Sequence, residues 1–313
     1  MSNSLKHQFK EAIEHCFIPG ADKHAIKRDK DQKNKNMHRI YSYAERETLI
    51  DIAMCFVNFL REEFPDVRYV KQIKPRHCTA FLQSKPNNCT QATIVQYSRK
   101  LNKLSKIVNH HYYIHTNYKA DIPKSNRGNE IRNVVMTRED LKIILNRGKD
   151  CTGKNALLLT AETGLRVTSL VKLKVTDVDF ENKTLFIYQD KGKRSRTIPL
   201  NEAAFNHLKE FCKGKEKWNY IFSAKDNNKK HIKNDSVNKF LRTNALKCGI
   251  TKYNDAKTGV HSIRKMVALE LYYQKRAEGQ NYIQAATYAI KYIGHSSYRK
   301  DLVKRYLPGI TED

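Results

Sequence analysis

The chain has 313 residues, a length that suits one large domain or two of ordinary size. Its 59 Lys and Arg residues outnumber its 32 Asp and Glu residues, which gives a formal charge of +27, and 40% of its residues are hydrophobic. This composition excludes a disordered, collagen-like or low-complexity chain, and no apolar run is long enough to span a membrane. So large a positive charge predicts a polyanionic partner, with nucleic acid as the leading candidate.

The seven cysteines are dispersed and form no CxxC pair, which argues against a disulfide framework or a zinc cluster. The first ten residues, MSNSLKHQFK, lack the apolar stretch of a secretory signal, so we expect a cytoplasmic protein with reduced thiols. No GxGxxG, Walker lysine loop or HExxH motif occurs. We therefore expect neither a metal nor another cofactor.

The first third of the chain has the periodicity of helices. Apolar side chains recur every three or four residues in four segments: 5–17, 43–64, 70–83 and 90–111. The third segment contains Pro75, which either kinks the helix or starts it. The polar, basic stretch 23–36 is expected to be a surface loop or arm.

Residues 116–133 have no apolar periodicity and contain Pro123 and Gly128, so they are the best candidate for a linker. We expect three parts in the chain: a basic helical domain at 1–122, which the family resemblance given below implies is the core-DNA-binding domain, a linker at 123–133 and a second domain at 134–313.

The second domain is expected to be mainly helical with one small antiparallel sheet, which makes the fold class mainly α with a small sheet (α+β). Two segments with period-two alternation, 184–189 and 195–200, flank the basic loop from Asp190 to Arg194, as is typical of a β-hairpin. A short strand is expected near 220–222. Helices are expected at 138–147, 156–163, 167–173, 202–213, 235–248, 262–276, 282–292 and 298–306.

Six polar residues lie where this pattern places helix ends or the hairpin tip. They are Arg166, Lys191, His261, Arg264, His295 and Tyr306. Metal-free phosphoryl transfer uses these residue types, because guanidinium groups neutralise phosphate oxygens, histidine and lysine move protons, and tyrosine is a nucleophile. Spacing alone also allows a simpler interpretation of each as a solvated charge, a helix cap or a packed aromatic.

The motifs around these residues resemble those of the tyrosine recombinase (phage integrase) family. The segment TGLRV at 163–167 resembles the first arginine box of the family. The hairpin with Lys191 at its tip, ending in TIPL at 197–200, resembles the strand pair that carries the family's lysine.

The remaining boxes follow in the family's order. HSIR at 261–264 resembles the H-x-x-R box, and IGHS at 293–296 resembles the G-H-S box. Tyr306 then falls at the position of the nucleophile. The resemblance covers about 137–306 with all six signature positions, whereas the N-terminal part resembles the family's helical core-binding domain only in length, charge and helicity.

The resemblance implies a site-specific DNA recombinase. Tyr306 would attack a scissile phosphate to give a 3′-phosphotyrosine and a free 5′-hydroxyl, while the two arginines hold the phosphate oxygens. His295 would add a hydrogen bond, His261 would assist proton movement, and Lys191 would protonate the 5′-oxygen. Neither metal nor ATP is implied, because the phosphotyrosine conserves the energy of the phosphodiester.

The partners implied by the resemblance are double-stranded DNA with specific recombination sites, held by both domains, and three further copies of the chain in a synaptic tetramer. DNA-bending accessory proteins belong to the same expectation. Integration or excision of a mobile element is favoured over the resolution of chromosome dimers.

The chain departs from the family pattern in three respects. Ser169 stands three residues after Arg166, where an acidic residue is usual. The intervals from Arg264 to His295 (31 residues) and from His295 to Tyr306 (11 residues) are longer than usual. Tyr298 is a rival nucleophile, but it lies only three residues after His295. Seven residues follow Tyr306, which leaves the mode of protomer docking open.

Two other functional classes remain open. A type IB-like topoisomerase would share the nicking chemistry without joining two duplexes, and an architectural DNA-binding protein would carry a degenerate site. His110, His111 and His115 could be interpreted as a metal site, but a DNA-facing or solvated stretch is the simpler interpretation of their place on a basic helix.

Overall fold

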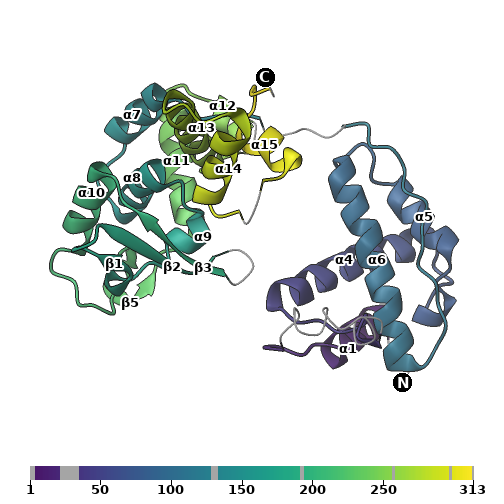
Figure 1. The fold of residues 1–313 in the computed structure, drawn as a ribbon. Coiled ribbons are helices and arrows are strands. Elements are labelled where there is room, and N and C mark those ends of the chain that lie inside the picture. The colour runs from purple at the N-terminus through teal and green to yellow at the C-terminus, as the bar shows by residue number, and fades with distance from the viewer. Residues whose placement is uncertain are drawn as a thin grey trace. The chain divides into compact units, whose positions relative to one another are not determined.

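The computed structural model describes residues 4–21, 35–127, 133–190, 194–255, 258–295 and 298–311. Most of the predicted loop at 23–36 lies outside these residues. The chain divides into two compact units (Figure 1), Met1–Glu130 and Ile131–Asp313. Each unit has its own hydrophobic core. No helix in the described part of the chain is long and apolar enough to cross a membrane.

The N-terminal unit is helical in all four segments where the periodicity predicts helices. Its elements are α1 (Leu5–His15), α4 (Tyr43–Glu63), the 3₁₀ turn η1 (Val70–Gln72), α5 (Pro75–Gln83) and α6 (Gln91–Tyr112). Pro75 starts α5 rather than kinking it, because the first position of a helix needs no backbone N–H donor.

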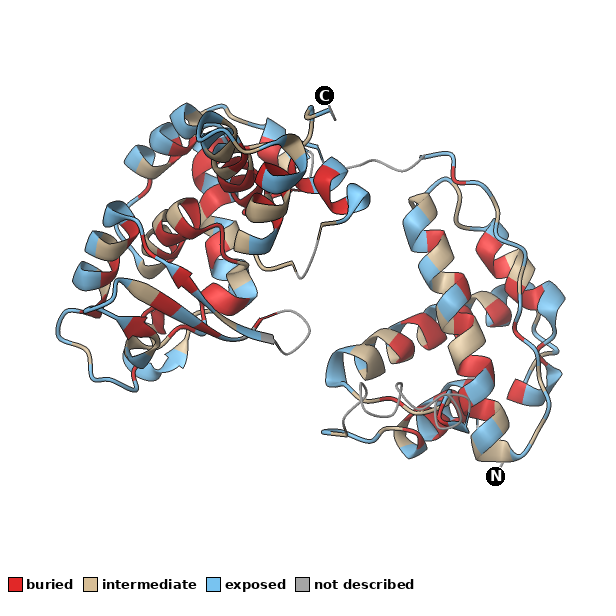
Figure 2. Cartoon of the chain, in the orientation of Figure 1, coloured by how far each residue is buried: buried red, intermediate tan, exposed pale blue. Residues whose placement is uncertain are grey.

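The core of the N-terminal unit is formed where the apolar faces of α1, α4 and α6 meet (Figure 2). Phe9, Phe56 and Tyr118 are fully buried there, and their rings make edge contacts. The hydroxyl of Tyr118 donates a hydrogen bond to the carbonyl of Val70 at 2.9 Å, so this buried polar group is satisfied.

The C-terminal unit confirms the fold class, mainly α with small antiparallel sheets. Its helices are α7 (Arg138–Arg147), α8 (Thr152–Thr163), α9 (Val167–Leu170), α10 (Glu202–Cys212), α11 (Asn234–Lys247), α12 (Lys252–Asp255), α13 (His261–Ala277), α14 (Tyr282–Tyr292) and α15 (Lys300–Tyr306). The other elements are the 3₁₀ turn η2 (Val175–Asp177) and the strands β1 (Val178–Asp179), β2 (Thr184–Asp190), β3 (Arg194–Pro199), β4 (Ser223–Ala224) and β5 (Asn227–His231).

The predicted hairpin is confirmed as β2 and β3, which pair antiparallel with β1 on the outer side of β2. Leu185 faces Ile198 in the register, and both side chains are buried against the helices. The pairing becomes irregular between Ile187 and Asp190, close to the hairpin tip.

The short strand expected near 220–222 is displaced along the chain to β4 (Ser223–Ala224). Tyr220 forms only an isolated bridge with Lys174, and the extended pair is β4 with β5. The sequence pattern missed β5 because its residues are polar and mostly exposed, so they lack the alternation of apolar side chains that marks a half-buried strand.

The close approach of α8 to α13 brings the chemistry-bearing segments together. Gly164 ends α8 in the left-handed region, at φ +60°. A methyl group there would lie 3.1 Å from Val267 on α13 and 3.2 Å from Ile293 after α14. The position directly after α8 therefore favours a small residue. Arg166 lies two residues further along the chain.

Candidate active site

Arg166 is held at the break between two helices. It precedes the first turn of α9, and its side chain is 15% exposed. Its Nη1 donates a hydrogen bond to Oδ2 of Asp190 at 2.8 Å. Its Nη2 lies 3.2 Å from Nε2 of His295 and 3.5 Å from the carbonyl oxygen of Gly294. The guanidinium is therefore fixed from two sides.

Arg264 lies in the first turn of α13 and is only 1% exposed. Its Nη1 donates to the carbonyl of Gly164 at 2.5 Å, and its Nη2 donates to the carbonyl of Ile293. Its Nε has no hydrogen-bond partner within the described ranges. A buried guanidinium held by carbonyl groups, with a donor to spare, suits an anion that arrives from outside.

Tyr306 is the last residue of α15 and is 5% exposed. Its ring lies edge-on to the imidazole of His261, with 5.3 Å between the ring centroids, and 4.9 Å from the ring centroid of His295. The guanidinium carbon of Arg264 lies 5.5 Å from the centroid of the tyrosine ring. The structure thus gathers two arginines, two histidines and one tyrosine.

Burial and the surrounding positive charges keep the imidazole of His261 neutral. Burial, and after it the positive charges of Arg264, Lys265 and Arg166, together lower the pKa of His261 to about 4. Burial also lowers the pKa of Arg264, with Arg166 as the next cause. In both groups the neighbouring positive charges add to the effect of burial, and an incoming anion would relieve that part of the shift.

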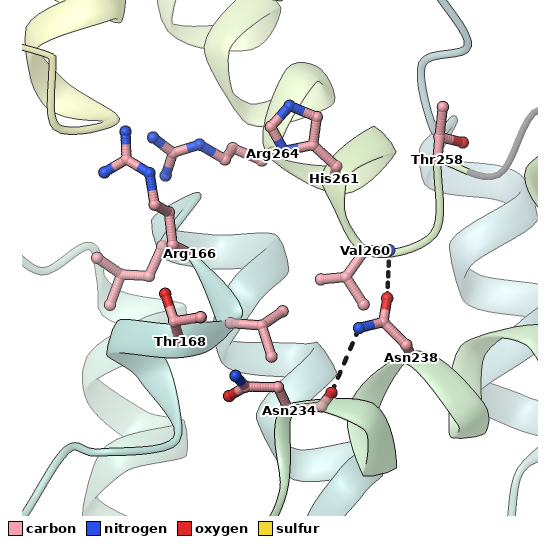
Figure 3. A pocket seen from close by; sticks show the side chains of 10 residues that line it. Arg166, Thr168, Asn234, Asn238, Thr258, Val260, His261 and Arg264 are labelled. Atoms are coloured by element: carbon pink, nitrogen blue, oxygen red, sulfur yellow. Dashed lines mark hydrogen bonds between the residues drawn. The ribbon is translucent and has the colours of Figure 1, made fainter. Parts of the chain in front are cut away.

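A cavity of about 280 Å³ opens beside these residues (Figure 3). Arg166, Arg264 and His261 line it, and their charged or basic groups lie on one side of it in the close-up view. Asn238 lies on the opposite side of the cavity, where its Oδ1 accepts a hydrogen bond from the backbone N–H of Val260 at 3.3 Å.

Lys191 and the hairpin tip up to residue 193 lie outside the described residues, so the structure does not place this predicted site residue. Tyr298, the rival of Tyr306, is described and half-buried against the cluster formed by α13, α14 and α15. The ring that contacts both His261 and His295 is that of Tyr306.

The sequence interpretation missed Asp190, the carboxylate that pairs with Arg166. It is 4% exposed, and it also accepts a hydrogen bond from Oγ of Ser169 at 2.8 Å. No local signal pointed to it, because an aspartate at the edge of a hairpin loop is an ordinary turn residue. Thr168, Asn234 and Asn238 also line the cavity, and no local pattern points to them.

Residues 134–278 match the phage integrase family. The chain is 31% identical to the tyrosine recombinase XerA of Pyrococcus horikoshii over 110 residues, which are 35% of each protein. It is 29% identical over 104 residues to a probable integrase/recombinase of Acholeplasma phage L2, covering 31% of this chain and 36% of that protein. The chain therefore spans about a third of the length of these two curated relatives.

A longer match reaches a tyrosine recombinase of Pseudothermotoga lettingae, with 24% identity over 223 residues, 69% of this chain and 73% of that protein. Among solved structures, XerH recombinase bound to a palindromic difH substrate superposes with a TM-score of 0.65 at 16% identity, over 98% of this chain and 93% of that one. The Tn1549 transposon integrase, in complex with circular intermediate DNA, gives 0.58 at 17% identity, over 96% and 98%. These structures share the fold.

Proposed function

We propose that the protein is a site-specific DNA recombinase that cuts and rejoins DNA through a 3′-phosphotyrosine, and the match of residues 134–278 to the phage integrase family supports this proposal. The observation that carries the proposal is the position of Tyr306, buried between two histidines and beside a buried arginine. A nucleophile surrounded by proton carriers and cations suits attack on a phosphodiester.

The steps follow from the positions of the groups. The hydroxyl oxygen of Tyr306 forms a bond to phosphorus while the bond from phosphorus to the 5′-oxygen breaks. Arg166 and Arg264 neutralise the nonbridging oxygens, on which negative charge accumulates in the transition state. His295, which lies against Arg166, adds a hydrogen bond to the same group.

Two proton transfers complete the cleavage. His261 accepts the proton of the phenol, because its lowered pKa keeps the imidazole neutral. Lys191, proposed from the sequence resemblance, gives a proton to the leaving 5′-oxygen. A 5′-hydroxyl from a second duplex then reverses the steps, so the reaction uses neither ATP nor a metal ion.

The remaining partners belong to the same proposal. The DNA-bound state of the related XerH and Tn1549 structures supports double-stranded DNA as the substrate. The charge of +27 is consistent with this partner. We propose a tetramer at synapsis, DNA-bending accessory proteins and the integration or excision of a mobile element as the biological role. The N-terminal unit would be the core-binding domain.

The proposal is tested with DNA fragments from the genome that encodes the chain. Each fragment is nicked so that the short 5′-hydroxyl strand is lost after cleavage, and covalent protein–DNA adducts are recovered under denaturing conditions and sequenced. The wild type and Tyr298→Phe should form the adduct, whereas Tyr306→Phe should bind DNA and form none. An adduct that persists in Tyr306→Phe and disappears in Tyr298→Phe would move the nucleophile to Tyr298.

The mapped site then separates the functional classes. Two duplexes that carry it should exchange strands if the protein is a recombinase. Relaxation of supercoils without joining of two duplexes would identify a type IB-like topoisomerase, and DNA binding without any adduct would identify an architectural protein.

A further inference from the structure

Asp190 is the last residue of β2, and both of its carboxylate oxygens are engaged. Oδ2 accepts from Nη1 of Arg166 at 2.8 Å and lies 3.5 Å from Nε of Arg196. Oδ1 accepts from Oγ of Ser169 at 2.8 Å. A carboxylate 3% exposed at its side chain is tolerated only when its charge is compensated in this way.

This carboxylate decides the direction of the Arg166 guanidinium. One arm of the fork, Nη1, is occupied by Asp190, and the other arm, Nη2, points to Nε2 of His295. His295 is in turn in contact with the ring of Tyr306. Because the guanidinium is planar, fixing one arm also fixes the plane and the direction of the other.

The same carboxylate separates charges that would otherwise repel. The side chains of Arg166 and Arg196 are both largely buried and both lie within ion-pair distance of Oδ2 of Asp190. Without the carboxylate, two largely buried guanidinium groups would repel each other, and the side chain of Arg166 would move toward solvent.

The packing around Asp190 leaves its carboxylate little freedom. Gly294 lies against it, and a methyl group at that residue would be 2.6 Å from Oδ2 of Asp190 and 2.9 Å from Nη2 of Arg196. The backbone of the G-H-S segment, the end of β2 and the start of α9 are therefore held together at this carboxylate.

Ser169 explains why the chain uses Asp190. Ser169 stands three residues after Arg166 on α9, where the family resemblance implies an acidic residue. Its hydroxyl cannot neutralise an arginine, but it donates to a carboxylate that comes from β2. The carboxylate beside Arg166 thus comes from the strand, and the helix supplies its donor.

We propose that Asp190 is the positioning residue that holds Arg166 ready for the scissile phosphate, with Ser169 as its fixed donor. The inference rests on the proposed function for the identity of the phosphate, and on the contacts of Asp190 for the positioning itself.

The first test measures single-turnover adduct formation on the nicked DNA. Asp190→Asn should lower the rate by about 10–10²-fold, the effect expected from a displacement of about 1 Å, with a dissociation constant for DNA close to that of the wild type. Ser169→Asp should also be slow, because two carboxylates then face each other. The double variant Ser169→Asp/Asp190→Asn should recover most of the rate, because it again pairs a carboxylate with a donor.

The structure has space for this double variant, in which the carboxylate and its donor are swapped. Ser169 and Asp190 both line a second cavity of about 720 Å³, so the larger side chain at 169 can be accommodated. If Asp190→Asn does not fold, Ser169→Ala replaces it as the milder variant and should be slower than the wild type for the same reason. Recovery in the swap supports the proposal, and wild-type rates in the single variants overturn it.

A double-mutant cycle with Arg166→Ala, measured by the rate of adduct formation, tests whether Asp190 acts through that arginine. Once Arg166 is absent, Asp190→Asn should cause no further loss, so the double variant Arg166→Ala/Asp190→Asn should be as slow as Arg166→Ala alone. Additive losses would show that Asp190 acts elsewhere and would overturn the assignment.

A second readout needs no DNA cleavage, which separates this inference from the proposed function. Phenylglyoxal modifies accessible guanidinium groups, and peptide mass spectrometry reports the rate at Arg166, with the exposed Arg138 as an internal control. Asp190→Asn should accelerate modification of Arg166 several-fold, and the swap should reverse the change. If the wild type forms no adduct on any DNA, the proposed function fails, and an unchanged rate at Arg166 would independently overturn the role of Asp190.

Discussion

Replacement of Gly294 by alanine tests how tightly the G-H-S segment packs on the candidate site. Gly294 follows α14 with φ +88°. Gly279 follows α13 with φ +85° and is a matched control, because a methyl group there meets nothing within 4 Å. Both variants force alanine into the left-handed region, but only Gly294→Ala also pushes a methyl group against Asp190.

The expected loss of stability has two sources, the left-handed backbone conformation and the contact of the methyl group with Asp190. The left-handed conformation costs about 1–2 kcal/mol for a residue with a Cβ, and this is the whole effect expected at Gly279. At Gly294 the methyl group would lie 2.6 Å from Oδ2 of Asp190, so the carboxylate must move away from Arg166. Loss of a hydrogen bond between charged groups adds about 1.5–3 kcal/mol. We therefore expect Gly294→Ala to lower the free energy of unfolding by about 2.5–5 kcal/mol.

The assay is denaturant unfolding followed by the fluorescence of Trp218, the only tryptophan of the chain, which lies in the C-terminal unit. Adduct formation is measured on the same preparations under conditions where each variant is folded. Gly279→Ala should retain the wild-type rate, and Gly294→Ala should lose it together with the position of Arg166. Equal losses of stability in the two variants, or full activity of Gly294→Ala, would refute the inference that this glycine is required by the contact with Asp190.

Three further predictions concern the chemistry and the charge. Lys191→Ala should cleave normal DNA about 10²–10⁴-fold more slowly, and a 5′-bridging sulfur at the scissile phosphate should restore most of the rate, because a thiolate leaves without a proton. Lys193→Ala is the control and should show no such rescue; rescue of this variant alone would identify the wrong lysine. The pH profile of the second-order cleavage rate reports groups of the free protein. Because the pKa of His261 is lowered to about 4, its imidazole stays neutral from pH 7 to pH 5, and the rate should fall only as the pH approaches 4; an acid limb centred near pH 6.5 would contradict this. The logarithm of the DNA association constant should fall with the logarithm of salt concentration by about 0.9 for each phosphate neutralised, as measured by titration at several salt concentrations, and a flat dependence would remove DNA as the partner of the positive charge.

Local signals in the sequence determined most of the secondary structure. The spacing of Leu49, Phe56 and Leu60 predicts the buried face of α4, and these side chains are buried in the structure. Asparagine is a favoured first cap of a helix, and the side chain of Asn201 accepts a hydrogen bond from the backbone N–H of Ala204 at 2.7 Å at the start of α10. Such features depend on residues within one or two turns, so a single segment is enough to specify them.

The types and order of the candidate site residues could also be predicted, because short motifs record them. The family resemblance rests on such motifs, and the match of residues 134–278 to the phage integrase family bears it out. The role of Lys191 stays a prediction, since it lies outside the described residues, and the roles of the other five stay predictions until the adduct is mapped.

Only the tertiary structure decided which carboxylate serves Arg166. Asp190 is 24 residues away in the sequence and lies on a strand, whereas Ser169 is the residue at the expected spacing on the helix. The charge of a buried arginine must be compensated wherever a carboxylate can reach it, and that reach depends on how β2 packs against α9 and the segment around Gly294. No local pattern encodes such a contact, because it is fixed by the packing of elements that are remote in the sequence.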